Sequence, residues 1–156
     1  MIFPILRALM VGASIGLLVY ATPAWAQTSV KVKFPWVRAT VPAQQTTGAF
    51  MTLIARQDSR LVAVDSPIAG LIEIHQMRVE GDVMRMRRID AIDLPAGQEV
   101  ALKPGGYHLM LMQLSKPLSV GQTVALRLTI QSARNKREVI QVNAPVRAIS
   151  AGHQKH

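Results

Sequence analysis

The stretch KPGGYHLMLM, residues 103–112, joins a turn to a strand whose two faces differ in chemistry. Lys-Pro-Gly-Gly is typical of a turn, because proline restricts φ and glycine adopts conformations that other residues avoid. In the run that follows, successive side chains point to opposite faces of a strand. One face offers an imidazole and two thioethers and the other offers leucines: His108, Met110 and Met112 against Leu109 and Leu111. We expect the leucines to hold this strand to a core.

Similar short apolar or alternating runs recur along the chain at intervals of roughly ten to fifteen residues, with turn residues between them. Nine segments are candidate strands: residues 30–34, 48–55, 61–66, 71–77, 83–89, 100–103, 108–114, 123–130 and 139–144. The segment Glu80-Gly81-Asp82 predicts a tight hairpin turn. No long amphipathic helix is evident in the sequence. The pattern predicts a single all-β domain, built as an antiparallel sandwich or a Greek-key barrel.

The first 26 residues differ from the rest of the chain. Arg7 precedes an apolar run of 13 residues, which is too short to span a bilayer comfortably as a mature helix. Ala24 and Ala26 then supply the small residues of a signal peptidase site. We predict a signal peptide over 1–26, cleaved after Ala26, and a periplasmic protein. The alternatives are an uncleaved membrane anchor or a buried helix.

The remaining chain divides into a predicted domain over 27–148 and a flexible tail over 149–156. Beyond the leader, 17 Lys and Arg stand against 9 Asp and Glu, a net charge of +8 that favours anionic partners. Export makes nucleic acid the least expected of these, and we expect no stable membrane insertion after cleavage. The chain has no cysteine. This composition excludes disulfides, thiol catalysis, Cys-ligated zinc or blue copper, and a lipoprotein anchor at the cut.

Histidine and methionine gather in one part of the chain. Two of the four histidines and five of the six methionines beyond the leader lie between residues 75 and 112: His75, Met77, Met84, Met86, His108, Met110 and Met112. Thioether sulfur is soft and suits Cu(I), whereas Mg, Ca and Mn prefer oxygen. A His/Met set without thiolate or carboxylate therefore points to Cu(I), and its neutrality favours transfer over permanent storage. For each methionine alone, core packing is the alternative interpretation.

These residues resemble the H-x10-M-x21-H-x-M signature of the periplasmic copper chaperones called PCu(A)C. His75 is followed after ten residues by Met86, and after twenty-one more by His108 and Met110. The resemblance extends over residues 36–53, 72–77, 83–87, 94–97 and 103–112. It implies a cupredoxin-like β-barrel or sandwich in which these four side chains hold Cu(I) near the surface.

The resemblance also implies a client. Family members deliver copper to respiratory oxidases, chiefly the binuclear centre of cytochrome c oxidase subunit II, and in some cases a cbb3-type oxidase is implicated. Another copper chaperone is a further candidate partner. An alternative with the same site is a periplasmic copper buffer or resistance protein without a dedicated client. A different class of protein, a non-metal β-sandwich interaction module, would use the same His and Met residues only for packing.

Several residues outside the signature leave alternatives open. For Met77, Met84 and Met112 we favour packing or rim positions over secondary copper ligation. His153 and His156 form either a weak Cu(II) site or, as we favour, solvated tail residues. Four arginines near the ligands form either a docking patch for an acidic client or a solvated face: Arg78, Arg85, Arg87 and Arg88.

We do not expect an enzyme. The chain lacks the G-x-S-x-G elbow of a serine hydrolase and the H-E-x-x-H helix of a zinc protease. Ser, His and Asp all occur, so residue types alone leave a catalytic triad open. A copper oxidase or an electron-transfer protein would want a cysteine or a more His-rich site.

Overall fold

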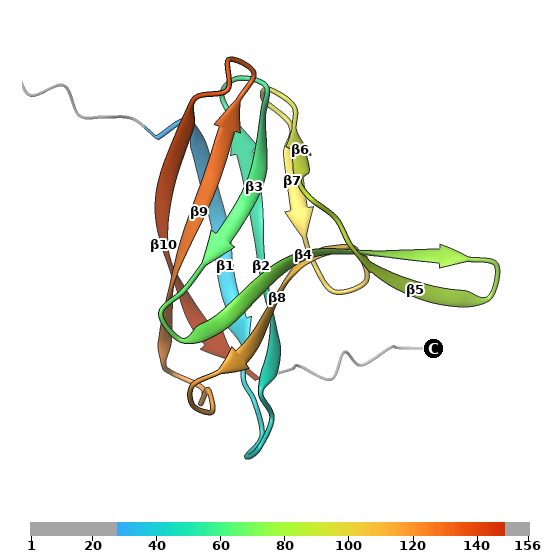
Figure 1. Ribbon diagram of the computed structural model, residues 1–156, viewed down its shortest axis with the longest axis vertical. Helices are drawn as coiled ribbons and strands as arrows, with labels where there is room; N and C mark the ends of the chain where they lie inside the picture. The colour runs from blue at the N-terminus through green and yellow to red at the C-terminus, as the bar shows by residue number, and fades with distance from the viewer. Residues whose placement is uncertain (1–27, 149–156) are drawn as a thin grey trace, which may run out of the picture.

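The structure, a computed structural model, describes residues 28–148 (Figure 1). The predicted signal peptide and the tail histidines lie outside the described residues. Within them the chain forms ten strands and no helix: β1 Val30–Arg38, β2 Thr46–Ala55, β3 Ser59–Asp65, β4 Ala69–Glu80, β5 Val83–Arg88, β6 Ile92–Leu94, β7 Glu99–Leu102, β8 Tyr107–Leu114, β9 Thr123–Ser132 and β10 Arg137–Arg147. No helix that could cross a membrane occurs in this part of the chain.

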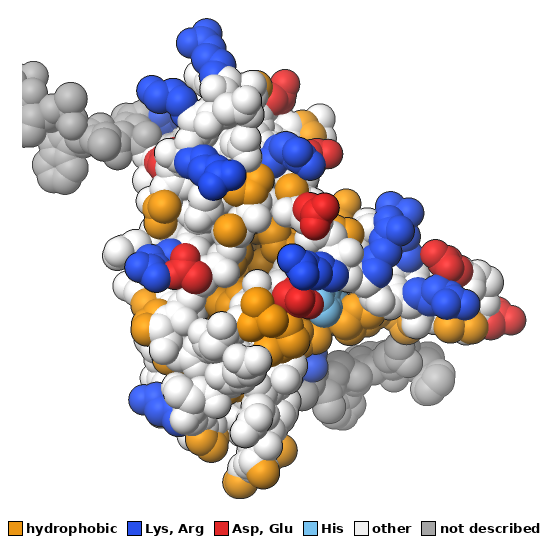
Figure 2. Space-filling view, in the orientation of Figure 1, with side chains coloured by type: hydrophobic (Ala, Val, Ile, Leu, Met, Phe, Trp, Pro, Cys, Tyr) orange, Lys and Arg blue, Asp and Glu red, His pale blue; other side chains and the backbone are white. Residues whose placement is uncertain are grey.

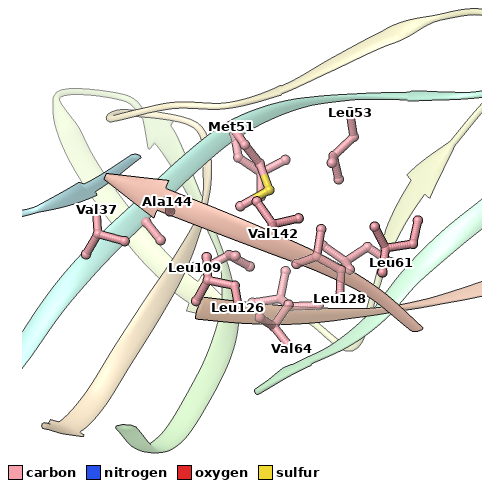
Figure 3. Close-up of a cluster of buried hydrophobic side chains, with 14 of the residues drawn as sticks. Val37, Met51, Leu53, Leu61, Val64, Leu109, Leu126, Leu128, Val142 and Ala144 are labelled. Atoms are coloured by element: carbon pink, nitrogen blue, oxygen red, sulfur yellow. The ribbon is translucent and has the colours of Figure 1, made fainter. Parts of the chain in front are cut away.

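The strands form two layers that enclose one core. The order β5-β4-β8-β7-β2-β1 makes one layer and β10-β9-β3-β6 makes the other. A short parallel pairing of β1 with β10 joins them. Side chains from both layers meet between them, including Leu109 of β8 and Leu126 and Leu128 of β9 (Figure 3). The predicted all-β, cupredoxin-like sandwich is therefore confirmed, and so is the burial of Leu109 and Leu111 in the core.

Strand β2 organises the layer that carries the histidines. One edge of β2 pairs with β1. On its other edge, the first half pairs with β8 and the second half pairs with β7. The Lys-Pro-Gly-Gly turn separates β7 from β8, and its Gly105 has a φ of 84°, which glycine adopts without strain. The turn therefore lies between β7 and β8, which both pair with β2.

Strands β4 and β5 form an arm that projects beyond the sandwich (Figure 1). The first part of β4 pairs with β8, over Ala69 to Gln76, and the outer part pairs with β5, over His75 to Glu80. Every residue of β5 is exposed. A two-residue connection with Gly81 at a φ of 65° closes the arm, as the tight hairpin prediction expected. His75 and Gln76 are paired on both sides and so form the root of the arm.

All nine expected segments occur as strands, several of them longer than expected, and one strand was not predicted. The three-residue β6 at the edge of the second layer was missed, because so short a run has no measurable period. The first strand was expected to end at residue 34, but β1 continues to Arg38. Its pairing with β2 shifts register between Lys33 and Trp36, and Phe34 has a φ of 51°. This irregularity carries Trp36 and Arg38 to the end of the sandwich where the histidines lie.

Replacing Leu109 by alanine tests whether β8 is held by its buried face. Leu109 has no exposed surface. The substitution should lower the free energy of unfolding by about 2–5 kcal/mol, because it removes apolar contacts and leaves a cavity. Urea denaturation of the metal-free protein measures this loss. Val139→Ala, at an exposed position of β10, should change the free energy by less than about 0.5 kcal/mol. Equal losses in both variants would contradict the assigned core.

Candidate metal centre

Two histidines face each other across neighbouring strands. His75 of β4 lies directly opposite His108 of β8 in the antiparallel register, and their ring centroids are 5.7 Å apart at 75°. The preceding residue Ile74 pairs with Leu109, and both of these side chains are buried. Because side chains alternate, burial of the apolar pair turns the two imidazoles toward the other face of the layer.

Each histidine uses one ring nitrogen in a hydrogen bond. The Nε2 atom of His75 is 2.8 Å from a carboxylate oxygen of Glu73, and Nδ1 of His108 is 3.1 Å from the carbonyl oxygen of Gly106. Both acceptors are oxygens, so in each pair the ring N–H donates. The opposite nitrogen of each neutral ring then carries a lone pair. For His75 this atom is Nδ1, which is buried and has no hydrogen-bond partner.

Glu73 accepts a hydrogen bond from His75, as carboxylates next to metal-ligating histidines commonly do. Its other carboxylate oxygen lies 3.6 Å from a guanidinium nitrogen of Arg88, so the carboxylate is held from two sides. Hydrogen bonding of one ring nitrogen to a carboxylate fixes the tautomer and orientation of a ligating histidine. Glu73 was not predicted from the sequence. Its position two residues before His75, on the same strand face, was the available indication.

The thioethers lie on the same face as the imidazoles. Met110 follows His108 by two positions on β8, and Met86 of β5 pairs with Met77 of β4. The register of β5, β4 and β8 thus brings the four signature residues together from three adjacent strands. Met86 is 45% exposed, whereas His108 is only 5% exposed. The arrangement therefore combines a buried end with an accessible end.

The other methionines differ in their relation to this centre. Met77 lines the same hollow as Met86. Met84 lies farther out on the arm, opposite Val79, and is 59% exposed, so it does not pack in a core. Met112 is half-buried, pairs with Leu71 and does not line the hollow. Among these three, the geometry favours Met77 as a neighbour of the proposed ligands.

A hollow of about 490 Å³ opens beside the histidines. Its wall contains thioethers, amides, an imidazole and one guanidinium but no carboxylate: Arg38, Gln44, Gln45, Thr46, Thr47, Gly48, Phe50, Met77, Met86, Pro104, Gly105, His108 and Met110. His75 does not line it. Figure 2 shows histidine at the root of the arm, beside acidic, basic and apolar side chains.

An aromatic stack supports His108 from the side of β2. Phe50 lies 6.5 Å from the His108 ring and 4.5 Å from Trp36, measured between ring centroids. Gly48 provides space for it, because a Cβ atom there would lie 2.8 Å from Cζ of Phe50. Trp36 and Phe50 lie within the region of family resemblance, but the sequence analysis assigned them no role. The structure brings them to the candidate centre.

The four arginines proposed for docking do not share one surface. Arg78 pairs with Arg85 across the arm, and Arg87 pairs with Gln76. By alternation these positions face away from the His/Met face. Arg88 pairs with His75 and contacts Glu73, so it lies on the face of the candidate centre. The strand is regular up to Arg88.

The available donors suit a soft metal ion. No group of three or more His, Cys, Asp and Glu side chains is placed to hold a metal anywhere within residues 28–148. A hard cation would need such an oxygen-rich set, and structural zinc usually takes four His, Cys or carboxylate ligands. Two imidazoles with two thioethers form a neutral, sulfur-containing set instead. The buried Nδ1 of His75 has no hydrogen-bond partner, which suits a metal ligand better than a side chain that only packs.

Comparison with known proteins matches this chain to a family model and to bacterial relatives. A family model described as "Putative lipoprotein LpqE-like" matches residues 30–146. The chain is 27% identical over 136 residues to "Putative lipoprotein Lxx21020" of Leifsonia xyli subsp. xyli, covering 86% of this chain and 80% of that protein. It is 29% identical over 123 residues to an uncharacterized protein, RP573, of Rickettsia prowazekii, covering 75% and 67% respectively.

Solved structures with this fold include copper-binding domains. The copper-bound PCuAC domain from PmoF2 superposes with a TM-score of 0.64 at 26% identity, covering 80% of this chain and 97% of that domain. The solution structure of CuI-DR1885 from Deinococcus radiodurans has a TM-score of 0.60 at 29% identity, covering 80% and 81%. The resemblance to PCu(A)C proteins is thus confirmed for the family and the fold. Copper ligation by the four signature residues stays a prediction.

Replacing Glu73 by alanine tests its hold on His75. In the parent protein, nitrogen chemical shifts of the neutral His75 ring should report the Nε2–H tautomer. In Glu73→Ala this preference should be lost, whereas Glu73→Gln, which retains an acceptor oxygen, should keep much of it. Glu99→Ala, which removes a carboxylate that pairs with Lys33, serves as the control. An unchanged tautomer in Glu73→Ala would show that the carboxylate does not orient the ring.

Proposed function

This chain belongs to the LpqE-like family, and we propose that it is an exported copper carrier that binds one Cu(I) ion as cargo. The observation that carries this proposal is the buried, partnerless Nδ1 of His75 beside His108 and two thioethers. Similarity to domains described as copper-bound and as CuI-bound supports it. The ligands are His75, Met86, His108 and Met110. The protein makes no covalent change in its cargo and is not an enzyme.

The ligand chemistry explains the preference for the reduced ion. Two neutral thioethers stabilise soft Cu(I) better than harder Cu(II), and no thiolate is present that oxidation outside the cytoplasm could destroy. Fixed hydrogen bonds to Glu73 and Gly106 hold the two imidazoles with their other nitrogens available. The bound ion keeps its positive charge, because none of the four ligands is ionised.

Release begins at the accessible end of the centre. Met86 is the exposed ligand and comes from the projecting arm, whereas the two histidines and Met110 come from strands of the sandwich. A ligand of an incoming protein can replace the Met86 thioether before the imidazoles are disturbed. Met77, opposite Met86, is a transient ligand during this exchange. The tail histidines His153 and His156 contribute at most a weak Cu(II) site.

The client is the copper centre of a respiratory oxidase. We assign subunit II of cytochrome c oxidase, with a cbb3-type oxidase or another copper chaperone as alternative partners, on the resemblance to PCu(A)C proteins. The carrier acts in the periplasm after cleavage behind Ala26. The membership of a lipoprotein-like family supports export. Copper buffering without a client is the second candidate, because its binding centre would be the same.

A Cu(I) titration against a colorimetric chelator tests the centre. The parent should bind one equivalent in competition with the chelator. His108→Asn retains a donor for the Gly106 carbonyl, and Met86→Leu retains apolar volume, yet each removes one ligand. Both should weaken binding by more than the roughly 10- to 100-fold that loss of a supporting residue costs. Met51→Leu, a core substitution on the opposite face of its layer, is the matched control.

Two results of this titration would contradict the proposal. One is failure of the parent to compete with the chelator, and the other is equal binding by all four proteins. Either result would mean that the His and Met residues only pack, which is the non-metal interaction module. Binding that is lost only in Met51→Leu would report unfolding instead.

Gene deletion separates the carrier from the buffer. Loss of a carrier that serves an oxidase should lower respiratory oxidase activity in limiting copper, with rescue by added copper. Loss of a buffer should leave oxidase activity intact and lower copper tolerance. Complementation with Met86→Leu should fail in whichever assay the parent restores, whereas Met51→Leu should succeed.

A further inference from the structure

One cation faces the hollow without an anionic partner. Arg38, the last residue of β1, lines the hollow together with His108 and Met86. Its guanidinium lies over the Phe50 ring, with Cζ 5.7 Å from the ring centroid. The Nε atom is buried and makes no hydrogen bond. Among residues 28–148, no Asp or Glu forms an ion pair with Arg38.

The surroundings of Arg38 concentrate positive charge. Arg147 of β10 stands beside it in the parallel register, so a second guanidinium belongs to the same edge. The Glu73 carboxylate of the centre is already held by His75 and Arg88. A bound Cu(I) would add a further positive charge, because its ligands are neutral. The loaded hollow therefore favours an anionic group.

The geometry of the Arg38 guanidinium favours a carboxylate as the anion. A guanidinium offers a planar fork of N–H donors that matches the two oxygens of a carboxylate. The guanidinium lies over the Phe50 ring, and a buried N–H donor without an acceptor is rare in proteins. Nε itself has no exposed surface, so a carboxylate that approaches from the hollow would reach the terminal guanidinium nitrogens of Arg38, which lines the hollow.

The hollow is large enough to admit a side chain of a partner polypeptide. A volume of about 490 Å³ is far larger than a metal ion needs. Three chain segments surround it: the arm with Met77 and Met86, the turn with Pro104 and Gly105, and the β1–β2 loop with Gln45. The loop is held in shape by the Gln44 side chain, which bonds the backbone at Val41 and Thr46. A partner segment in the hollow would lie against the exposed Met86.

We propose that this hollow is the docking site for an acidic segment of the protein that exchanges copper with this chain, anchored by a carboxylate on Arg38. The partner's role in copper exchange rests on the proposed function, whereas the anchor itself does not. The proposal places docking on the face of the ligands. It differs from docking on Arg78, Arg85 and Arg87, which lie on the opposite face of the arm.

Titration with a hexaglutamate peptide, blocked at both ends, tests the anchor. Nitrogen-15 spectra of the protein report the Arg38 Nε–H signal and the backbone amides of Gly48 and Phe50. We expect these signals to shift in the metal-free protein and to shift at lower peptide concentration once Cu(I) is bound. Arg38→Gln should weaken binding by about tenfold or more, and Arg38→Lys by less, because lysine keeps the charge without the fork.

Matched controls separate the anchor from general charge attraction. Lys31→Gln removes one exposed positive charge from the same strand, far from the hollow, and should change binding by less than about twofold. A blocked hexaglutamine peptide should not shift the Arg38 signal. Arg78→Gln tests the opposite face of the arm and should have an effect as small as that of Lys31→Gln.

Several outcomes would overturn the proposal. Shifts confined to Arg78, Arg85 and Arg87 would place docking on the other face of the arm. Equal weakening by Arg38→Gln and Lys31→Gln would show nonspecific attraction. Equal shifts with free acetate at the same carboxylate concentration would make Arg38 a small-anion site. Because the metal-free titration needs no copper, the anchor can be tested even if the Cu(I) titration fails, and an unchanged Arg38 signal in the folded parent rejects it without any variant.

Discussion

The candidate centre depends on the burial of one apolar face. Leu109 and Leu111 of β8, together with Ile74 of β4, fill the core between the two layers. Because side chains alternate, this burial turns His75, His108 and Met110 to the other face and sets the register that places the imidazoles opposite each other. A slip of one residue would expose leucines and bury the polar rings. The same apolar contacts that stabilise the fold therefore assemble the donors.

The sequence predicted those parts in which a local pattern repeats. Alternation predicted β4, β5 and β8, and the position of Gly81 predicted the end of the arm. The pairing of His75 with His108 joins residues far apart in the chain, so only the family resemblance placed them together before the structure did. Arg38 was missed because Pro35 and the bulge at Phe34 interrupt the period of β1. Glu73 was missed because an acidic residue in a strand usually faces water.

The centre combines neutral donors with charged residues just behind or beside them. Glu73 and Arg88 form a pair that compensates itself and orients His75 without adding charge to the donor set. Arg38 is different, because no carboxylate in residues 28–148 compensates it. This arrangement suits a carrier. Contacts within the protein orient the metal ligands, and the uncompensated charge of Arg38 stays available to attract another molecule.

Because Met86 lies on the arm, it is more mobile than the other residues of the candidate centre. A two-stranded ribbon in water is only marginally stable, and β5 has no buried residue to hold it. Local opening of such a segment costs far less free energy than opening of the core strands. Met86 therefore opens and closes on the timescale of the arm, whereas His108 stays in place on the timescale of global unfolding. On the proposed ligand set, the residence time of a bound ion would be governed by the fraying of one hairpin, independently of how stable the sandwich is.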